Sequence, residues 1–179
     1  MSYLSIHGWF DFESLYVEVV ASAQPDDILV EVGVWCGKSV VFLAQRAEMS
    51  GKALRIFAVD TWQGSTPCED AALVGKDGQL WRTFLENIRV NGVNHVITPM
   101  CLPSVQAAAY FADGSAYMVF IDAEHVYESV RNDILAWRPK VKPGGWLAGH
   151  DWESDEVKRA VREVLGEPTL HGSCWTFRI

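Results

Sequence analysis

The sequence predicts an α/β protein built on a doubly wound, mostly parallel sheet with helices on both faces. Strand-like and helix-like segments alternate along the whole chain, the order that crossover helices between parallel strands produce. The expected strands are apolar at almost every position, as strands covered on both faces are. With 179 residues, 49% of them hydrophobic, the chain is large enough to bury one such sheet, so we expect a single domain over 1–179.

The first half of the chain supplies a lead-in segment and three pairs of strand and helix. The lead-in covers 1–24 and carries a helix over 10–23, with apolar residues at helical spacing. The expected strands span 28–32, 54–59 and 95–99, and the expected helices span 39–49, 79–90 and 104–111. The stretch 61–78 is rich in small and turn-forming residues, and we expect a loop there over the crevice at the carboxyl ends of the strands.

The second half continues this alternation. We expect strands over 116–121 and 146–149, joined by a helix over 127–141 and the turn Lys142-Pro143-Gly144-Gly145. Because a crossover helix returns the chain to the same edge, these two strands should be parallel neighbours. A last helix over 154–165, with Ser154 as its N-cap, precedes one or two terminal strands in 169–179, one of them antiparallel.

Charge and apolar pattern exclude several classes of partner. The formal charge of -8, from 15 basic and 23 acidic residues, disfavours a nucleic-acid partner, because phosphate neutralisation requires clustered Lys and Arg. No segment approaches the ~20 apolar residues of a membrane helix, and Met1 to Trp9 lack the features of a signal peptide. We therefore expect a cytoplasmic protein with a small-molecule substrate. The aromatic content is compatible with a homodimer, and the oligomeric state stays open.

Acidic and imidazole side chains stand where the expected strands end. In chain order, these ends carry Asp60, then Asp122 with His125, then His150 with Asp151. The carboxyl ends of neighbouring parallel strands face one crevice, which is where open α/β sheets bind ligands. These side chains are therefore the first candidates for chemistry.

The turn after the first strand has the features of a ligand-binding loop. Gly33 and Gly37 follow a buried strand and open a helix, where backbone N–H groups and the positive end of the helix dipole meet an anion. Their spacing differs from the G-x-G-x-x-G of nicotinamide binders. Although Gly37-Lys38-Ser39 looks like the end of a P-loop, Val32 stands where a P-loop requires glycine. Nucleoside triphosphate binding is therefore disfavoured.

Four strings, in this order, resemble the class I S-adenosylmethionine-dependent methyltransferases, whose fold is Rossmann-like. The first runs from Glu31 to Ser39 and contains the two glycines. The other three make the chain most similar to the bacterial branch called methyltransferase family 24, which includes small-molecule O-methyltransferases. They are Asp60-Thr61-Trp62-Gln63-Gly64, Ile121-Asp122-Ala123-Glu124-His125-Val126-Tyr127-Glu128, and Lys142-Pro143-Gly144-Gly145 leading to Gly149-His150-Asp151-Trp152. The resemblance covers nearly the whole chain.

The resemblance implies a binding site for S-adenosylmethionine. Gly33 and Gly37 would pack against the methionine part of this cofactor, whose ammonium group would lie near Glu31. Glu31 stands among apolar residues, and a buried carboxylate needs a partner. Asp60 would accept hydrogen bonds from the ribose hydroxyls, which offer two donors to one carboxylate. The same likeness assigns further cofactor contacts to Ser39, Thr61, Trp62, Ser104 and Asp122, with Trp62 and Ser104 near ribose and adenine.

A divalent metal stays open. Relatives that depend on a metal bind it with the acid ending the fourth strand and a pair of acids ending the fifth. Asp122 and Asp151 match two of these positions, but His150 replaces the first acid of the pair. Mg²⁺ prefers oxygen ligands, whereas an imidazole also admits softer divalent metals.

Two histidines compete for the role of general base. A hydroxyl that attacks a methyl group must lose its proton, and an imidazole near its ordinary pKa accepts one at neutral pH. The resemblance implies this role for His125, next to Asp122. The residues alone leave two alternatives: His125 caps the following helix or hydrogen-bonds Asp122, or His150 is the base.

The combined expectation is an enzyme that transfers a methyl group from S-adenosylmethionine to a hydroxyl oxygen of a small molecule. Two other classes stay open. One is a catalytically silent nucleoside-binding module with the same fold. The other is a nicotinamide-dependent oxidoreductase, which the missing G-x-G-x-x-G disfavours. The sequence does not indicate which molecule accepts the methyl group, or whether the accepting atom is oxygen or nitrogen.

Overall fold

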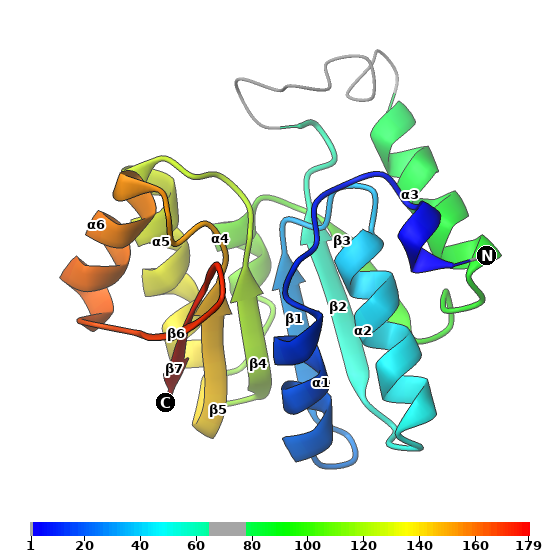
Figure 1. The fold of residues 1–179 in the computed structure, drawn as a ribbon, viewed down its shortest axis with the longest axis horizontal. Helices are drawn as coiled ribbons and strands as arrows, with labels where there is room; N and C mark the ends of the chain where they lie inside the picture. The colour runs from blue at the N-terminus through cyan, green and yellow to red at the C-terminus, as the bar shows by residue number, and fades with distance from the viewer. Residues whose placement is uncertain (1, 65–77) are drawn as a thin grey trace.

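The structure, a computed structural model, describes residues 2–64 and 78–179. These residues form a seven-stranded sheet in the order β3-β2-β1-β4-β5-β7-β6, with helices on both faces (Figure 1). The strands are β1 (Ile28–Val32), β2 (Arg55–Asp60), β3 (Ile97–Cys101), β4 (Ala116–Ile121), β5 (Val141–Gly149), β6 (Thr169–His171) and β7 (Cys174–Arg178). The helices are α1 (Glu13–Ser22), α2 (Lys38–Met49), α3 (Gln79–Val90), α4 (Ser104–Ala108), α5 (Tyr127–Trp137) and α6 (Asp155–Leu165), with short 3-10 helices η1 (Tyr3–Ser5) and η2 (Arg138–Lys140).

The strand pairing confirms the predicted fold class. Strands β1 to β5 pair in parallel, including β4 with β5, while β7 runs antiparallel to both β5 and β6. The strand order reverses between β1 and β4, where Val32 lies opposite Ile121. In open α/β sheets this switch point is the preferred place for a ligand. Within the described residues, no helix is both long and apolar enough to cross a membrane.

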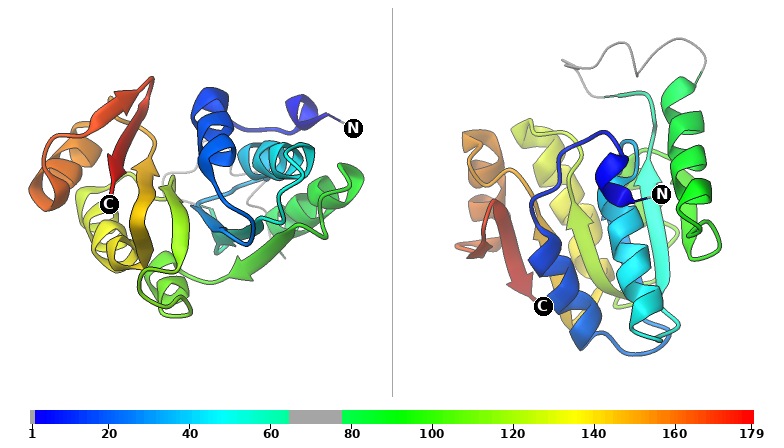
Figure 2. Two further views of the ribbon diagram at one scale, coloured as in Figure 1. Left: turned by 90° about the horizontal axis from the view of Figure 1, so that it is seen from below. Right: turned by 45° about the vertical axis from the view of Figure 1, so that its right-hand side comes forward.

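Two hydrophobic layers hold the helices to the sheet. Alternate residues of a strand point to opposite faces, so Leu29 joins the layer under α1, α2 and α3, and Val30 joins the layer over α4, α5 and α6. Figure 2 shows the two groups of helices on the two sides of the sheet. Strand β4 is buried at all its positions, which explains its uninterrupted apolar sequence.

The lead-in helix is shorter than predicted. It begins at Glu13 and not at residue 10. The rings of Phe10 and Phe12 pack edge to face at 4.7 Å, and Phe12 lies 5.1 Å from Tyr16. This aromatic group fixes the segment before the helix as an irregular stretch packed on the core.

Strand β3 and helix α4 also differ from the prediction. The strand expected over 95–99 begins at Ile97, because the amides of Val96 and Ile97 donate to the Val93 carbonyl in a turn after α3. Pro99 is tolerated in β3 because this edge strand pairs only with β2 among the described strands. Helix α4 ends at Ala108 and not at 111.

The predicted turn before β5 is part of the strand. β5 begins at Val141, and Gly144 and Gly145 exchange backbone hydrogen bonds with Ile179. Helix α5 ends four residues earlier than its predicted end at 141, and the 3-10 helix η2, which contains Pro139, follows it. Ser154 occupies the N-cap position of α6 as predicted, but its side chain makes no capping hydrogen bond.

Candidate active site

Four carboxylates come to the same edge of the sheet. Glu31 lies in β1, Asp60 ends β2, Asp122 follows β4 directly, and Asp151 comes two residues after the end of β5. Since β2, β1, β4 and β5 are consecutive neighbours and parallel, these residues stand side by side along the carboxyl ends of the strands. The structure therefore brings together the acids that the sequence singled out.

The turn after β1 is pressed against the end of β4. Gly33 has φ +87° and donates its N–H to the Val59 carbonyl at 2.8 Å. A Cβ on Gly33 would overlap the backbone of Asp122, so only glycine fits there. Gly37 has φ +89°, and a Cβ on it would lie 2.9 Å from the Phe84 ring. The chain's own packing requires both glycines, and their predicted contact with a cofactor stays a prediction.

Glu31 is completely buried and held by two hydroxyl groups. The Tyr16 hydroxyl donates to Oε2 at 2.8 Å, and the Ser39 hydroxyl donates to Oε1. Burial raises the pKa of Glu31 to about 8, against the effect of these two hydrogen bonds and with a contribution from the charges of Asp122 and Asp60. Ser39, predicted to contact the cofactor, thus contacts Glu31.

Asp60 ties the turn after β1 to the end of β2. One carboxylate oxygen accepts the N–H groups of Val34 and Trp35, each at 3.0 Å, and the other accepts that of Trp62 at 2.7 Å. Burial raises the pKa of Asp60, although these backbone hydrogen bonds act in the opposite direction. A backbone hydrogen bond from Thr61 acts in the same direction as these hydrogen bonds, so the chain itself uses most of the lone-pair positions of this carboxylate. Thr61, next in the chain, accepts the Gln63 amide with its hydroxyl at 3.3 Å.

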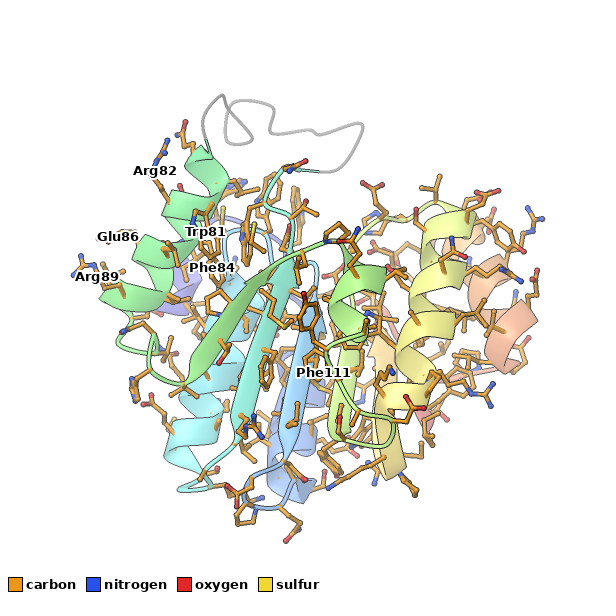
Figure 3. The ribbon with its side chains drawn as sticks, turned by 180° about the vertical axis from the view of Figure 1, so that it is seen from behind. Trp81, Arg82, Phe84, Glu86, Arg89 and Phe111 are labelled. Atoms are coloured by element: carbon orange, nitrogen blue, oxygen red, sulfur yellow. The ribbon has the colours of Figure 1, made fainter. Side chains whose placement is uncertain are left out.

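Trp62 and Ser104 have partners within the protein. The Trp62 indole N–H donates to the Trp35 carbonyl at 3.0 Å, and its ring lies 4.4 Å from Trp81 and 4.7 Å from Phe84. Figure 3 shows Trp81 and Phe84 on the sheet side of α3. Ser104 accepts the indole N–H of Trp137 at 2.9 Å. The roles of Trp62 and Ser104 beside ribose and adenine stay predictions. Residues 65–77 of the loop expected over 61–78 lie outside the described residues.

The acids after β4 and β5 form a cluster with two imidazoles. His125 Nε2 lies 2.9 Å from Asp151 Oδ2 and 3.8 Å from Asp122 Oδ1. His150 Nδ1 lies 3.2 Å from Asp151 Oδ2 and 3.8 Å from Asp122 Oδ1. Each histidine therefore faces both carboxylates, and we call these four residues the Asp/His cluster.

The carboxylates keep both imidazoles protonated at neutral pH. Hydrogen bonding to Asp122 and Asp151 raises the pKa of His125 to about 10, against the effect of burial. Burial lowers the pKa of His150, but its hydrogen bond to Asp151 and the charges of Asp122 and Asp151 outweigh burial and raise the pKa to about 9. An imidazolium accepts no proton, so neither histidine is ready to act as a base in this state. A base role requires that a ligand or cation first displaces the proton.

Asp11 joins this cluster from the lead-in segment, and the sequence did not single it out. Its Oδ1 lies 2.9 Å from His150 Nε2, and Ser173 Oγ donates to both of its oxygens. The one sequence signal for Asp11 is its place between two aromatic residues, Phe10 and Phe12, that lead into a helix. Tyr16, the partner of Glu31, was also not singled out.

Three ligand atoms of the cluster are close enough to hold one metal ion. Asp122, His125 and Asp151 each offer one atom, and these atoms lie within 4.8 Å of one another. The predicted ligand set was Asp122, Asp151 and His150. The structure thus puts His125, predicted as the base, among the potential ligands.

Comparison with known proteins decides the family. Residues 30–152 match the family described as Methyltransferase domain, Methyltransf_24. The chain belongs to this methyltransferase family. The match begins inside β1 and ends just after Asp151, so it contains all four carboxylates at the ends of the strands. It leaves out η1 and α1, and with them Asp11 and Tyr16.

Solved structures confirm the class I methyltransferase fold. The O-methyltransferase NovP has a TM-score of 0.72 and 18% identity, with 93% of this chain and 78% of NovP covered. The calicheamicin methyltransferase CalS11 has a TM-score of 0.66 and 18% identity over 93% and 76% of the two chains. A SAM-dependent O-methyltransferase from Thermotoga maritima has a TM-score of 0.64 and 14% identity, with 92% of this chain and 52% of that protein covered.

A relative among curated proteins is much longer. The uncharacterized protein y4gI of Sinorhizobium fredii is 26% identical over an alignment of 156 residues, which covers 80% of this chain. The chain spans 16% of that relative's length.

Proposed function

We propose that the chain transfers a methyl group from S-adenosylmethionine to a hydroxyl oxygen of a small molecule. The main support for the proposal is a contact between two backbone segments. Gly33, in the turn after β1, lies against the backbone of Asp122, the first member of the Asp/His cluster. A cofactor on the turn and an acceptor on the cluster would thus be neighbours. Holding nucleophile and methyl carbon in line is worth about 7 to 11 kcal/mol in favourable cases.

The charges at the strand ends fit this cofactor. S-adenosylmethionine supplies a methyl group on a positively charged sulfur, together with an ammonium group and a ribose diol. Glu31 has two hydroxyl partners and keeps free lone pairs for the ammonium group. Asp60, at the end of β2, would accept a hydrogen bond from the ribose hydroxyls. Both interactions would be charge-assisted hydrogen bonds.

The Asp/His cluster would orient the acceptor and, once a ligand or cation has displaced a proton from one imidazolium, take up the proton of the acceptor. Asp122 and Asp151 hold His125 and His150 in place, so a hydroxyl bound there meets an imidazole and a carboxylate together. A divalent cation fits the same group, since it would supply the positive charge that the two imidazolium groups supply here. With imidazole among the ligands, Mn²⁺, Fe²⁺ or Zn²⁺ suits the group better than Mg²⁺ does.

A small molecule is the proposed acceptor class. The formal charge of -8 opposes a nucleic-acid substrate. Two of the similar structures, NovP and the Thermotoga maritima protein, are called O-methyltransferases, which supports oxygen as the accepting atom.

Titration calorimetry with S-adenosylhomocysteine tests the proposal. The intact chain should bind this product, and Asp60→Asn should bind it at least tenfold more weakly, because the hydrogen bonds to a carboxylate are lost. Asp113→Asn, which removes a carboxylate ion-paired with Lys140, is the matched control and should bind as the wild type does. If the wild type binds neither S-adenosylhomocysteine nor S-adenosylmethionine, the proposed function is wrong. Binding without turnover over a broad panel of hydroxyl compounds would favour the silent module.

A further inference from the structure

Helix α1 contacts the proposed cofactor site although it lies outside the matched part of the family. The match begins at residue 30, whereas α1 spans Glu13–Ser22. Figure 1 shows α1 in front of β1, the strand that carries Glu31. Tyr16 of α1 is completely buried and packs 5.1 Å from Phe12 and 5.3 Å from Phe120, ring centre to ring centre. Its ring therefore has one fixed place under the helix.

The Tyr16 hydroxyl determines how the Glu31 carboxylate is turned. It donates to Oε2 at 2.8 Å, while Ser39 of α2 donates to Oε1. With one donor on each oxygen, rotation of the carboxylate breaks at least one buried hydrogen bond. Such a loss costs more in the interior than at the surface. The carboxylate is thus preorganised by one hydroxyl from each of two helices, α1 and α2.

Burial and neighbouring charges oppose ionisation of Glu31, so its charged form depends on these two hydrogen bonds. Burial raises the pKa of Glu31, and the negative charges of Asp60 and Asp122 act in the same direction. The hydroxyls of Tyr16 and Ser39 are the groups that lower it. Without Tyr16, Glu31 would lose one of the two donors that stabilise its charged form.

We propose that Tyr16 is a positioning residue for the amino-acid end of the cofactor: it holds the Glu31 carboxylate, charged and oriented, for the ammonium group. The inference rests on the proposed function. It makes the lead-in helix a part of the binding site and assigns a role to a residue that the family match does not include.

Two ligands separate this role from a purely structural one. S-adenosylhomocysteine carries the amino-acid part, whereas 5′-methylthioadenosine has the same nucleoside and sulfur without it. Tyr16→Phe should weaken binding of S-adenosylhomocysteine by roughly tenfold or more, as expected for a lost hydrogen bond to a charged group. It should leave binding of 5′-methylthioadenosine within a factor of about two, a loss well below one hydrogen bond. Ser14→Ala, which removes a hydroxyl of the same helix that contacts His171, is the control and should alter neither.

The pH dependence gives a second readout. Affinity for S-adenosylhomocysteine should fall as the pH drops below the pKa of Glu31, and in Tyr16→Phe this fall should begin at higher pH. Titration calorimetry at several pH values between 6 and 9 measures both curves. Serine at position 39 is unchanged in this comparison, so the shift reports on the Tyr16 hydroxyl.

The outcomes are distinguishable. If the wild type binds no S-adenosylhomocysteine, the proposed function itself is wrong. If the wild type binds it and Tyr16→Phe binds both ligands as the wild type does, or loses both equally, the inference about Tyr16 is wrong while the proposed function stands. A selective loss of the amino-acid ligand with the shifted pH curve supports the inference.

Discussion

The buried carboxylate of Glu31 should make the protein less stable as the pH rises. Its pKa of about 8 in the folded chain lies above the ordinary value of 4.5, so the folded state holds the proton more tightly than the unfolded state does. The contribution of Glu31 to stability is therefore greatest below pH 4.5, declines between pH 4.5 and 8, and levels off above. A shift of this size corresponds to at most about 5 kcal/mol, at 1.36 kcal/mol per pKa unit.

Glu31→Gln removes this titration. A neutral amide resembles the protonated carboxyl group in size and hydrogen bonding, so the two proteins should have similar stability at pH 5. At pH 8.5 the variant should be more stable by up to about 5 kcal/mol. Urea denaturation between pH 5 and 9 measures the difference, with Glu18→Gln, which removes an exposed carboxylate of α1, as control. Parallel curves for wild type and Glu31→Gln would refute the reasoning.

Two further predictions concern the turn and the cluster. Gly33→Ala should lower the free energy of unfolding by about 3 kcal/mol or more, because the new Cβ overlaps the Asp122 backbone. Gly114→Ala, at φ +67° with open space around it, is the control and should lower the free energy of unfolding clearly less. Equal decreases for the two variants in urea denaturation would contradict the overlap. Mn²⁺ added to metal-free protein should bind at the Asp/His cluster with release of protons from the imidazolium groups, seen by electron paramagnetic resonance and calorimetry. Asp122→Asn should abolish this binding and Asp113→Asn should not; unchanged Mn²⁺ binding in Asp122→Asn would exclude the cluster as the metal site.

The sequence predicted those features that short patterns determine. The strands β1 and β4 were predicted to the residue, because each is an apolar run that ends at a glycine or an acid. The common edge for Asp60, Asp122 and Asp151 followed from the parallel order alone. The start of β5 was missed because it depends on distant pairing: Val141 pairs with Ala116 before a register shift, and Gly144 and Gly145 bond to Ile179.

Contacts between side chains distant in sequence could not be predicted. Asp11 contacts His150, which lies 139 residues later in the sequence, and neither residue type nor spacing predicts this contact. His125 and His150 both direct a ring nitrogen at Asp122 and Asp151, and the group whose ligand atoms lie within 4.8 Å of one another contains His125. Such distances depend on packing, here of Phe12 and Ser173 around His150, which short sequence patterns do not specify.

The two outer strands have a consequence for self-association. β3 carries Pro99, which lacks a backbone N–H, and β6 is only three residues long. A strand of a second copy would find few backbone N–H and C=O groups to pair with at either outer strand, because β3 lacks one N–H and β6 is very short. Strand-to-strand growth into larger aggregates is thereby discouraged at both outer strands of the described sheet.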